Sequence, residues 1–387
     1  MKRLLYIAFK DLSDPYLGGN TKVRSQCRAF SDYGFDVELI GRSADRTVCI
    51  RADGTTGILG TRYAFTKNKR LNSILGKAFQ IRDMIRCLSR QNYDACYIRY
   101  DFSDPMFLRL LRHLRPRCQK ILLEIPTYPY EGENRYGLAS RMRMAADRLC
   151  RTRLHRYIDQ IVTFYEGYPT LFRIPVLIIP NGFDFSSMAL VSAPLPEDGI
   201  HIAAVSSMRE WHGYERIMDG LHRYYGSDLP EKRNFVVHLV GHGRLFPVYE
   251  ALVAQYQLQE HVILEGALHG DALQAIYERC ALGIDSLGRH RSDISRLSSL
   301  KSREYAAKGL PIINSCPIDV IEEDYPYLLL VPADETPLDF DAIAEFYDRC
   351  FHSGKSRQEV GLILRNYMER SCNMKKTLLP VVEMLRT

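Results

Sequence analysis

The chain has 387 residues, of which 46% are hydrophobic, and a formal net charge of +6. This length permits a large buried core and favours two domains. No apolar run approaches the roughly 20 residues that a membrane-spanning helix needs, and the short apolar run after the basic start predicts a first β-strand rather than a signal peptide. The ten cysteines occur singly, without the spacing of a metal site, which is typical of a reducing cytosol.

Charge is distributed unevenly along the chain. Residues 1–190 contain 31 Lys and Arg against 18 Asp and Glu, a net of +13, whereas residues 191–387 contain 21 against 28, a net of −7. Two halves of opposite charge predict two domains with different partners. The basic half suits an anionic membrane or a phosphate-bearing acceptor. Nucleic acid is not expected, because the sequence contains no recognised DNA- or RNA-binding motif.

The first half alternates short apolar runs with helical patterns. Between the first two runs, Gly18 and Gly19 open a segment in which Val23, Cys27 and Phe30 recur on one helical face. The predicted strands are Leu4–Phe9, Phe35–Ile40, Ala95–Tyr100, Lys120–Ile125, Gln160–Tyr165 and Val176–Pro180. Such alternation predicts βαβ units and a parallel sheet.

The same alternation restarts after a segment with two prolines. Its predicted strands are Ile200–Ser206, Phe235–Gly241, Val262–Gly266, Leu282–Leu287, Leu310–Asn314 and Leu328–Pro332. We therefore expect an α/β protein with two doubly wound, Rossmann-like domains that face a central cleft. The expected boundaries are 1–186 for the first domain, 187–199 for a linker, 200–365 for the second domain and 366–387 for a helix that packs back on the first.

Ligands of open α/β sheets bind beyond the carboxyl ends of the strands, so residues just after strands are candidates for a binding site. Gly19 follows the first strand, and its backbone could approach a ligand closely. Arg209 and His212 follow the first strand of the second half. The next strand ends in Gly241 and Gly243, without the third glycine of a dinucleotide fingerprint, which excludes a Rossmann dehydrogenase.

The segment 298–315 carries the strongest candidate site. Ser298 or Ser299 is expected to cap a helix over Leu300–Lys308 that ends at Gly309. A lysine in the first turn of a helix, Lys301, is unfavourable unless an anion shares the site. Backbone donors at Ser299 and Leu300, with Lys301 and the nearby arginines, would suit a diphosphate.

The order of these pieces resembles the GT-B glycosyltransferases of the retaining type often called family four, in particular a bacterial surface-polysaccharide subgroup. The resemblance covers nearly the whole chain. It is carried by the Gly-Gly loop, Pro180–Asp184, the Gly-x-Gly strand end and Glu304-Tyr-Ala-Ala-Lys-Gly-Leu-Pro, which is similar to the family's Glu-Ala-x-Ala-x-Gly-x-Pro. Two positions depart from the pattern. Ser207 stands where the family has a diphosphate-binding arginine, and Arg296 stands where it has a glutamate near the donor sugar.

The resemblance implies transfer of a sugar from a nucleoside diphosphate sugar to a lipid-linked or polysaccharide acceptor, with retention. The implied donor-binding residues are Gly19, Arg209, His212, Gly241, Gly243, Ser299, Leu300, Lys301 and Glu304, the last on the ribose. No cofactor is expected beyond this co-substrate, and no metal, because Asp339 and Asp341 are better explained as the N-cap of a helix. No catalytic residue is assigned, although Glu124, Tyr128 and Glu131 follow a strand of the first half. A nucleotide-sugar epimerase and a non-catalytic nucleotide-sugar-binding homologue remain as alternatives.

Two stretches of the basic half, Lys67–Arg90 and Arg135–Tyr157, alternate apolar and basic residues at helical spacing. Such segments suit docking on an anionic leaflet, although a core helix with a solvated basic face explains them equally well. We accordingly expect a cytoplasmic protein, with a peripheral position on the inner face of the cell membrane as the membrane-bound alternative.

Overall fold

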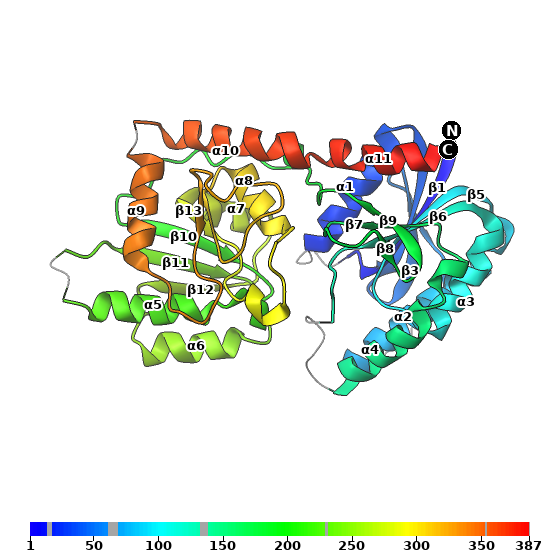
Figure 1. The fold of residues 1–387 in the computed structure, drawn as a ribbon, viewed down its shortest axis with the longest axis horizontal. Helices are drawn as coiled ribbons and strands as arrows, with labels where there is room; N and C mark the ends of the chain where they lie inside the picture. Colours follow the sequence, from blue (N-terminus) through cyan, green and yellow to red (C-terminus); the bar gives the residue numbers. More distant parts are fainter. Residues whose placement is uncertain (14–17, 61–68, 132–137, 229–230, 353, 387) are drawn as a thin grey trace. The chain divides into compact units, whose positions relative to one another are not determined.

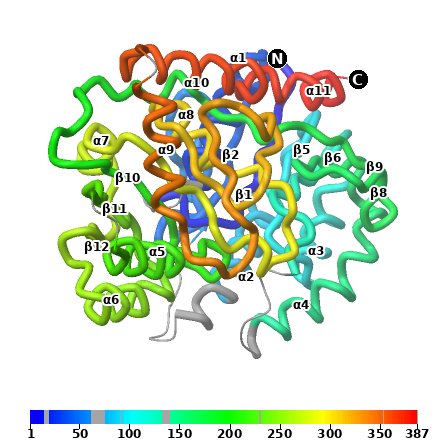
Figure 2. The backbone as a smooth tube through the Cα atoms, turned by 60° about the vertical axis from the view of Figure 1, so that its left-hand side comes forward, coloured from blue at the N-terminus to red at the C-terminus, as the bar shows by residue number. Residues whose placement is uncertain are grey.

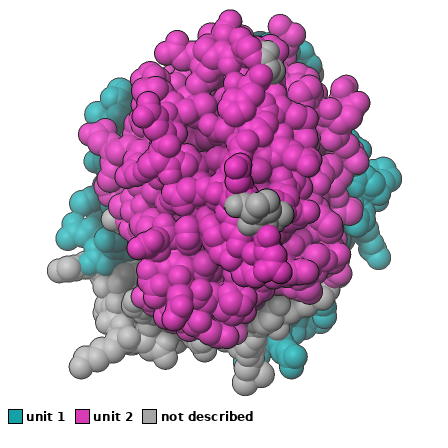
Figure 3. All heavy atoms as spheres, turned by 90° about the vertical axis from the view of Figure 1, so that its left-hand side faces the viewer, with its two compact units in different colours: residues 1–182, 374–387 teal, residues 183–373 magenta. Residues whose placement is uncertain are grey.

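The computed structural model describes residues 1–13, 18–60, 69–131, 138–228, 231–352 and 354–386. The chain forms two compact units, which Figure 3 distinguishes by colour. Unit 1 comprises residues 1–182 and 374–387, and unit 2 comprises residues 183–373. No helix in the described part of the chain is long and apolar enough to span a membrane.

Unit 1 is built on a nine-stranded sheet of order β4-β3-β2-β1-β5-β6-β7-β9-β8. The six central strands pair in parallel; they are β2, β1, β5, β6, β7 and β9. Strands β3, β4 and β8 are antiparallel additions at the two edges. The strands are β1 (Lys2–Asp11), β2 (Phe35–Ser43), β3 (Arg46–Arg51), β4 (Thr56–Ile58), β5 (Tyr93–Arg99), β6 (Cys118–Ile125), β7 (Gln160–Thr163), β8 (Thr170–Leu171) and β9 (Ile174–Ile178).

Helices cover both faces of this sheet. The helices of unit 1 are α1 (Gly18–Asp32), α2 (Lys69–Cys87), α3 (Pro105–Leu114), α4 (Leu138–Arg151) and α11 (Met374–Arg386). Alternate residues of β1 belong to different cores: Leu5 and Ile7 pack with α2 and α3, whereas Leu4 and Tyr6 pack with α1 and α11. The period of two along a strand thus produces the doubly wound arrangement.

Unit 2 is built on a six-stranded, wholly parallel sheet of order β12-β11-β10-β13-β14-β15. In strand order along the unit this is 3-2-1-4-5-6, the order of a doubly wound nucleotide-binding domain. The strands are β10 (Ile200–Val205), β11 (Phe235–Val240), β12 (Val262–Gly266), β13 (Leu282–Ile284), β14 (Ile312–Asn314) and β15 (Leu328–Leu330). The expected α/β fold with two doubly wound sheets is confirmed.

The helices of unit 2 lie on both sides of its sheet, with α5 and α6 on one side and α7, α8 and α10 on the other (Figures 1 and 2). They are α5 (Glu215–Gly226), α6 (Phe246–Gln255), α7 (Gly270–Arg279), α8 (Leu300–Lys308), α9 (Phe340–Phe351) and α10 (Arg357–Cys372). One large core beneath them extends from Phe183 to Cys372.

The unit boundaries differ from the domain boundaries expected from the sequence. The segment 187–199, expected as a linker, is held to unit 2, because its backbone bonds to Lys308, Glu278 and Arg357. Residues 366–373 also stay in unit 2 as the end of α10, whose Gly361 packs against Gly309. The return to unit 1 occurs at Met374, where α11 buries Leu378, Val381 and Leu385 in the core that contains α1.

Candidate nucleotide-binding site

The loops that follow β10 and β13 meet at the carboxyl end of the unit 2 sheet, where the strand order reverses. The Leu287 N–H donates to the His212 carbonyl at 2.8 Å. Gly213 has φ of +63°, and a Cβ built there would lie 2.7 Å from the nitrogen of Gly288. Only glycine fits so close an approach in the left-handed region. This reversal is the place where doubly wound domains bind ligands.

Helix α8 begins beside these loops. The Ser299 side chain accepts from the Lys301 N–H at 3.0 Å, and Gly309 ends the helix with φ of +80°. Both ends were predicted at these residues, and both are confirmed. In the described part of the chain, neither the Ser299 N–H nor the Leu300 N–H donates to another residue. These free donors and the helix dipole together favour an anion.

A buried ion pair holds the first turn of α8 in place. The guanidinium of Arg303, which is fully buried, contacts both carboxylate oxygens of Asp319 at 2.7 Å. Asp319 also accepts from the Ser298 hydroxyl at 2.6 Å, and Arg303 donates to the Ser299 carbonyl at 2.8 Å. The backbone before the helix is therefore fixed, so its free N–H groups are preorganised.

Lys301 has a partner within the protein. Its Nζ lies 3.0 Å from the Asp285 carboxylate, and it also donates to the Ser286 hydroxyl at 3.0 Å. Burial alone would raise the pKa of Asp285, but Lys301 and hydroxyl donors hold that pKa below its usual value. An external anion was expected to offset the charge of Lys301, but the structure provides Asp285 as its partner. An acidic residue directly after a buried strand was the signal that could have revealed it.

His212 and Arg209 form the other side of the site. The Nδ1 atom of His212, a buried residue, accepts from the Arg209 N–H at 2.9 Å. Burial and the surrounding cations Lys301, Arg289 and Arg209 hold the pKa of His212 well below its usual value. The imidazole is therefore neutral, with its proton on Nε2 as a donor. The Arg209 guanidinium is exposed, and no described residue pairs with it.

Most of the arginines around α8 are committed to the fold rather than available to a ligand. Besides Arg303, Arg291 pairs with Glu215 and Glu335, and Arg296 donates to the Asp319 carbonyl at 3.3 Å. Their density in the sequence was our strongest indication of an anionic ligand, and the structure corrects that argument. Among these side chains, Arg289 has its charged group 5.9 Å from the Trp211 ring centre and close enough to His212 to lower its pKa.

Gly241 and Gly243 allow two loops beside the site to approach each other closely. A Cβ on Gly241 would lie 1.8 Å from the Ser206 carbonyl oxygen, and one on Gly243 would lie 2.0 Å from that of Ser207. The two glycines let the loop after β11 pack against the loop that carries Arg209. That Gly241 and Gly243 contact the donor nucleotide sugar directly remains a prediction.

Glu304 lies one turn along α8. Its carboxylate accepts from the Tyr277 hydroxyl of α7 at 2.8 Å. Burial raises the pKa of Glu304, although Tyr277 and Lys308 oppose the shift. A carboxylate oriented by a tyrosine can accept hydrogen bonds from ribose hydroxyls, which is the role that the resemblance implies.

The candidates in unit 1 have structural partners. Gly19 lies in the first turn of α1, where an added Cβ would meet the Lys10 ammonium at 2.5 Å. Glu124 is fully buried and ion-paired with Arg99, and it also accepts from Tyr97 at 2.7 Å. Glu131 pairs with Arg151 at 2.7 Å. Neither carboxylate is free to act as a base in this arrangement.

The structure supports the reading of Asp339 as a helix cap. Its carboxylate accepts from the N–H groups of Asp341 and Ala342 at the start of α9. Among the described residues, no group of three or more His, Cys, Asp or Glu side chains could hold a metal ion.

No protein-family model and no curated protein matches the sequence. Solved structures are similar over the whole chain. Sucrose-phosphate synthase from Thermosynechococcus elongatus has a TM-score of 0.71 and 17% identity, covering 100% of this chain and 98% of its own. The catalytic domain of starch synthase IV from Arabidopsis thaliana, bound to ADP and acarbose, has a TM-score of 0.67 and 12% identity, with coverage of 100% and 99%.

A third similar structure is a TarM variant from S. aureus in complex with fondaparinux, alpha-GlcNAc-glycerol and UDP. Its TM-score is 0.62 and its identity 10%, with both chains covered completely. Identities this low establish the fold alone. The chain has the GT-B fold, as predicted from the sequence.

Proposed function

We propose that this protein is a glycosyltransferase that moves a sugar from a nucleoside diphosphate sugar to a lipid-linked or polysaccharide acceptor in cell-surface glycan synthesis. Unit 2 would bind the donor, and unit 1 the acceptor. The similar starch synthase binds ADP and the TarM variant binds UDP, so nucleoside diphosphates are the ligands to test first. Transfer would proceed with retention and without a metal.

The observation that carries this proposal is a set of hydrogen-bond donors at the strand reversal of unit 2. The Ser299 and Leu300 N–H groups, the His212 Nε2–H and the exposed Arg209 guanidinium have no partner among the described residues. A departing diphosphate gains negative charge as the bond to the sugar breaks. Fixed donors aimed at that charge stabilise the transition state more than the ground state.

Arg209 provides the sharpest test, because its side chain is exposed and its guanidinium pairs with no described residue. We expect Arg209→Gln to weaken the binding of UDP or ADP by about tenfold or more, since a hydrogen bond to a charged group contributes about 1.5–3 kcal/mol. The matched control is Arg223→Gln, an exposed arginine of α5. Calorimetric titration of both variants measures the difference. Equal affinities would refute the placement of the diphosphate.

A screen of nucleotide sugars then identifies the reaction. Release of the nucleoside diphosphate with transfer of the sugar supports a glycosyltransferase, and analysis of the anomer of the product tests retention. A changed sugar on an intact donor would indicate an epimerase, and binding without turnover a non-catalytic homologue. If neither UDP, ADP nor GDP binds, the proposal fails.

A further inference from the structure

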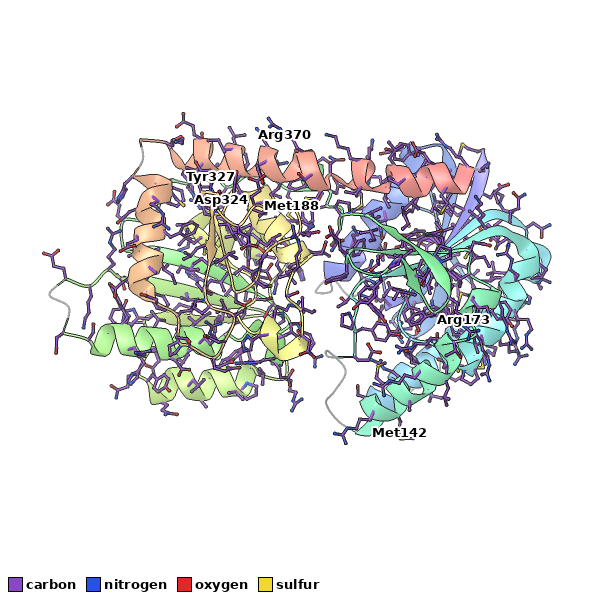
Figure 4. The ribbon with its side chains drawn as sticks, viewed as in Figure 1. Met142, Arg173, Met188, Asp324, Tyr327 and Arg370 are labelled. Atoms are coloured by element: carbon purple, nitrogen blue, oxygen red, sulfur yellow. The ribbon has the colours of Figure 1, made fainter. Side chains whose placement is uncertain are left out.

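We infer that the exposed face of α4 docks on an anionic lipid bilayer. Two apolar residues of this helix stand out in solvent: Met142 is 66% exposed (Figure 4) and Leu149 is 71% exposed. Apart from Met1, these are the two most exposed large hydrophobic residues in the described part of the chain. They are seven positions apart, with the exposed Ala145 between them, so the three share one face of the helix.

Basic side chains flank this apolar stripe. The segment 138–158 contains six arginines and a single acidic residue, Asp147, which is fully buried. Arg141 and Arg148 are exposed on α4, and Arg153 and Arg156 follow just after the helix. No described carboxylate pairs with any of these four. An exposed apolar stripe beside unpaired arginines is the pattern of a helix that lies in the interface of an anionic membrane.

The buried face of α4 holds the helix rigidly, so the exposed stripe is not a loosely attached segment. The Asp147 carboxylate accepts from the Ser103 N–H at 2.6 Å, the Tyr100 hydroxyl at 2.5 Å and the Tyr130 hydroxyl at 2.7 Å. Met144 and Cys150 enter the core beside β5 and β6. The exposed side chains of α4 can therefore contact a surface without any rearrangement of the fold.

The charge pattern decides between a bilayer and a second copy of the chain. A dimer through this face would bring together two sets of arginines with which no described carboxylate pairs, and this repulsion opposes association. Anionic headgroups instead supply the missing charge, and the long arginine side chains can reach them while Met142 and Leu149 enter the acyl boundary. This docking goes beyond the proposed sugar transfer and does not depend on it.

Sedimentation of the full chain with vesicles tests the inference. We expect binding to vesicles of equal parts phosphatidylglycerol and phosphatidylcholine, little binding to phosphatidylcholine alone, and release at about 0.5 M NaCl. Arg141→Gln with Arg148→Gln should weaken binding by about twenty-fivefold, at about fivefold per arginine. Met142→Gln with Leu149→Gln should weaken it by about a hundredfold.

The matched control replaces exposed residues of the same kinds in unit 2: Leu362→Gln and Ile363→Gln on α10, with Arg223→Gln and Arg370→Gln. Of these four residues, Figure 4 labels Arg370. Circular dichroism shows that each variant is folded, and light scattering gives its oligomeric state. The inference holds if only the α4 variants lose vesicle binding. It is overturned if the wild type ignores anionic vesicles, if the control loses as much binding, or if the α4 variants change the oligomeric state instead.

Discussion

The Lys301–Asp285 pair should behave as a buried ion pair that supports the site. Asp285 is fully buried, and the Lys301 side chain is 18% exposed. Lys301→Met would remove the cation and leave a buried carboxylate, although Ser302 and Ser286 would still donate to it. Removing one partner of a buried ion pair lowers the free energy of unfolding by about 3–5 kcal/mol. Because these donors remain, we expect the lower value, about 3 kcal/mol, for Lys301→Met.

Neutralising both partners should cost less than the sum of the single changes. Asp285→Asn alone leaves the lysine without its counterion, which we expect to cost about 2 kcal/mol. In the double variant the new asparagine amide can donate to the Ser286 hydroxyl while its oxygen still accepts from Ser302. We expect the double variant to cost about 2 kcal/mol, which implies a coupling of about 3 kcal/mol.

The single tryptophan of the chain makes the assay specific to unit 2, because Trp211 lies in the loop after β10. Urea unfolding followed by its fluorescence reports this unit, with a midpoint shift of about 1.5 M for Lys301→Met. Additive costs in the double variant, or a cost below about 1 kcal/mol for Lys301→Met, would refute the assignment of the pair.

Two further predictions concern the same loops. Because the pKa of His212 is lowered in the folded state, the unfolded chain binds the extra proton first, and the free energy of unfolding falls as the pH drops below the usual histidine pKa of about 6.5. In His212→Asn the asparagine oxygen can still accept from the Arg209 N–H. In urea unfolding followed by Trp211 fluorescence, this variant should lose about 1 kcal/mol less stability between pH 6.5 and 5.5 than the wild type. An unchanged pH slope would contradict a neutral, buried imidazole. Gly241→Ala should cost about 3 kcal/mol or prevent folding, because its Cβ would collide with the Ser206 carbonyl, whereas Gly266→Ala, at φ of +68° with open space around it, should cost about 1 kcal/mol by the same assay. If the two variants lose similar free energies of unfolding, the loop at Gly241 can move to make room for a side chain.

The sequence predicted the parts of the fold that depend on periodicity and local capping. Apolar runs of four to eight residues separated by helical patterns located the parallel strands, and the Ser299 cap and Gly309 stop placed α8 to the residue. These signals are local, because hydrogen bonds of a cap involve neighbours in the chain. The boundaries of the units could not be predicted from neighbouring residues in the sequence. They depend on bonds such as those from Arg357 to the 187–199 segment, which no window of the sequence displays.

In the candidate site, too, the sequence predicted the features set by neighbouring residues but not those set by distant contacts. The sequence placed Arg209 and His212 after a strand, and Lys301 and Glu304 in the first turns of a helix. The structure gathers the first three around the loops after β10 and β13. The sequence could not tell which charges were already paired. Arg291 and Arg303 counted equally with Arg209 in the sequence, but their carboxylate partners, Glu335 and Asp319, come from elsewhere in unit 2.

The paired and unpaired cations of this site are expected to have different roles. Lys301 and Asp285 nearly cancel each other's charge, so the pair adds little net attraction for an anion, and it fixes the first turn of α8 through Ser302. We therefore expect the attraction to come from the N-terminus of the helix and from Arg209, whose charge pairs with no residue that the structure describes. A diphosphate would gain an ion pair with Arg209 that costs the protein no existing contact. For this reason we expect Lys301 to matter mainly for stability, and Arg209 mainly for binding.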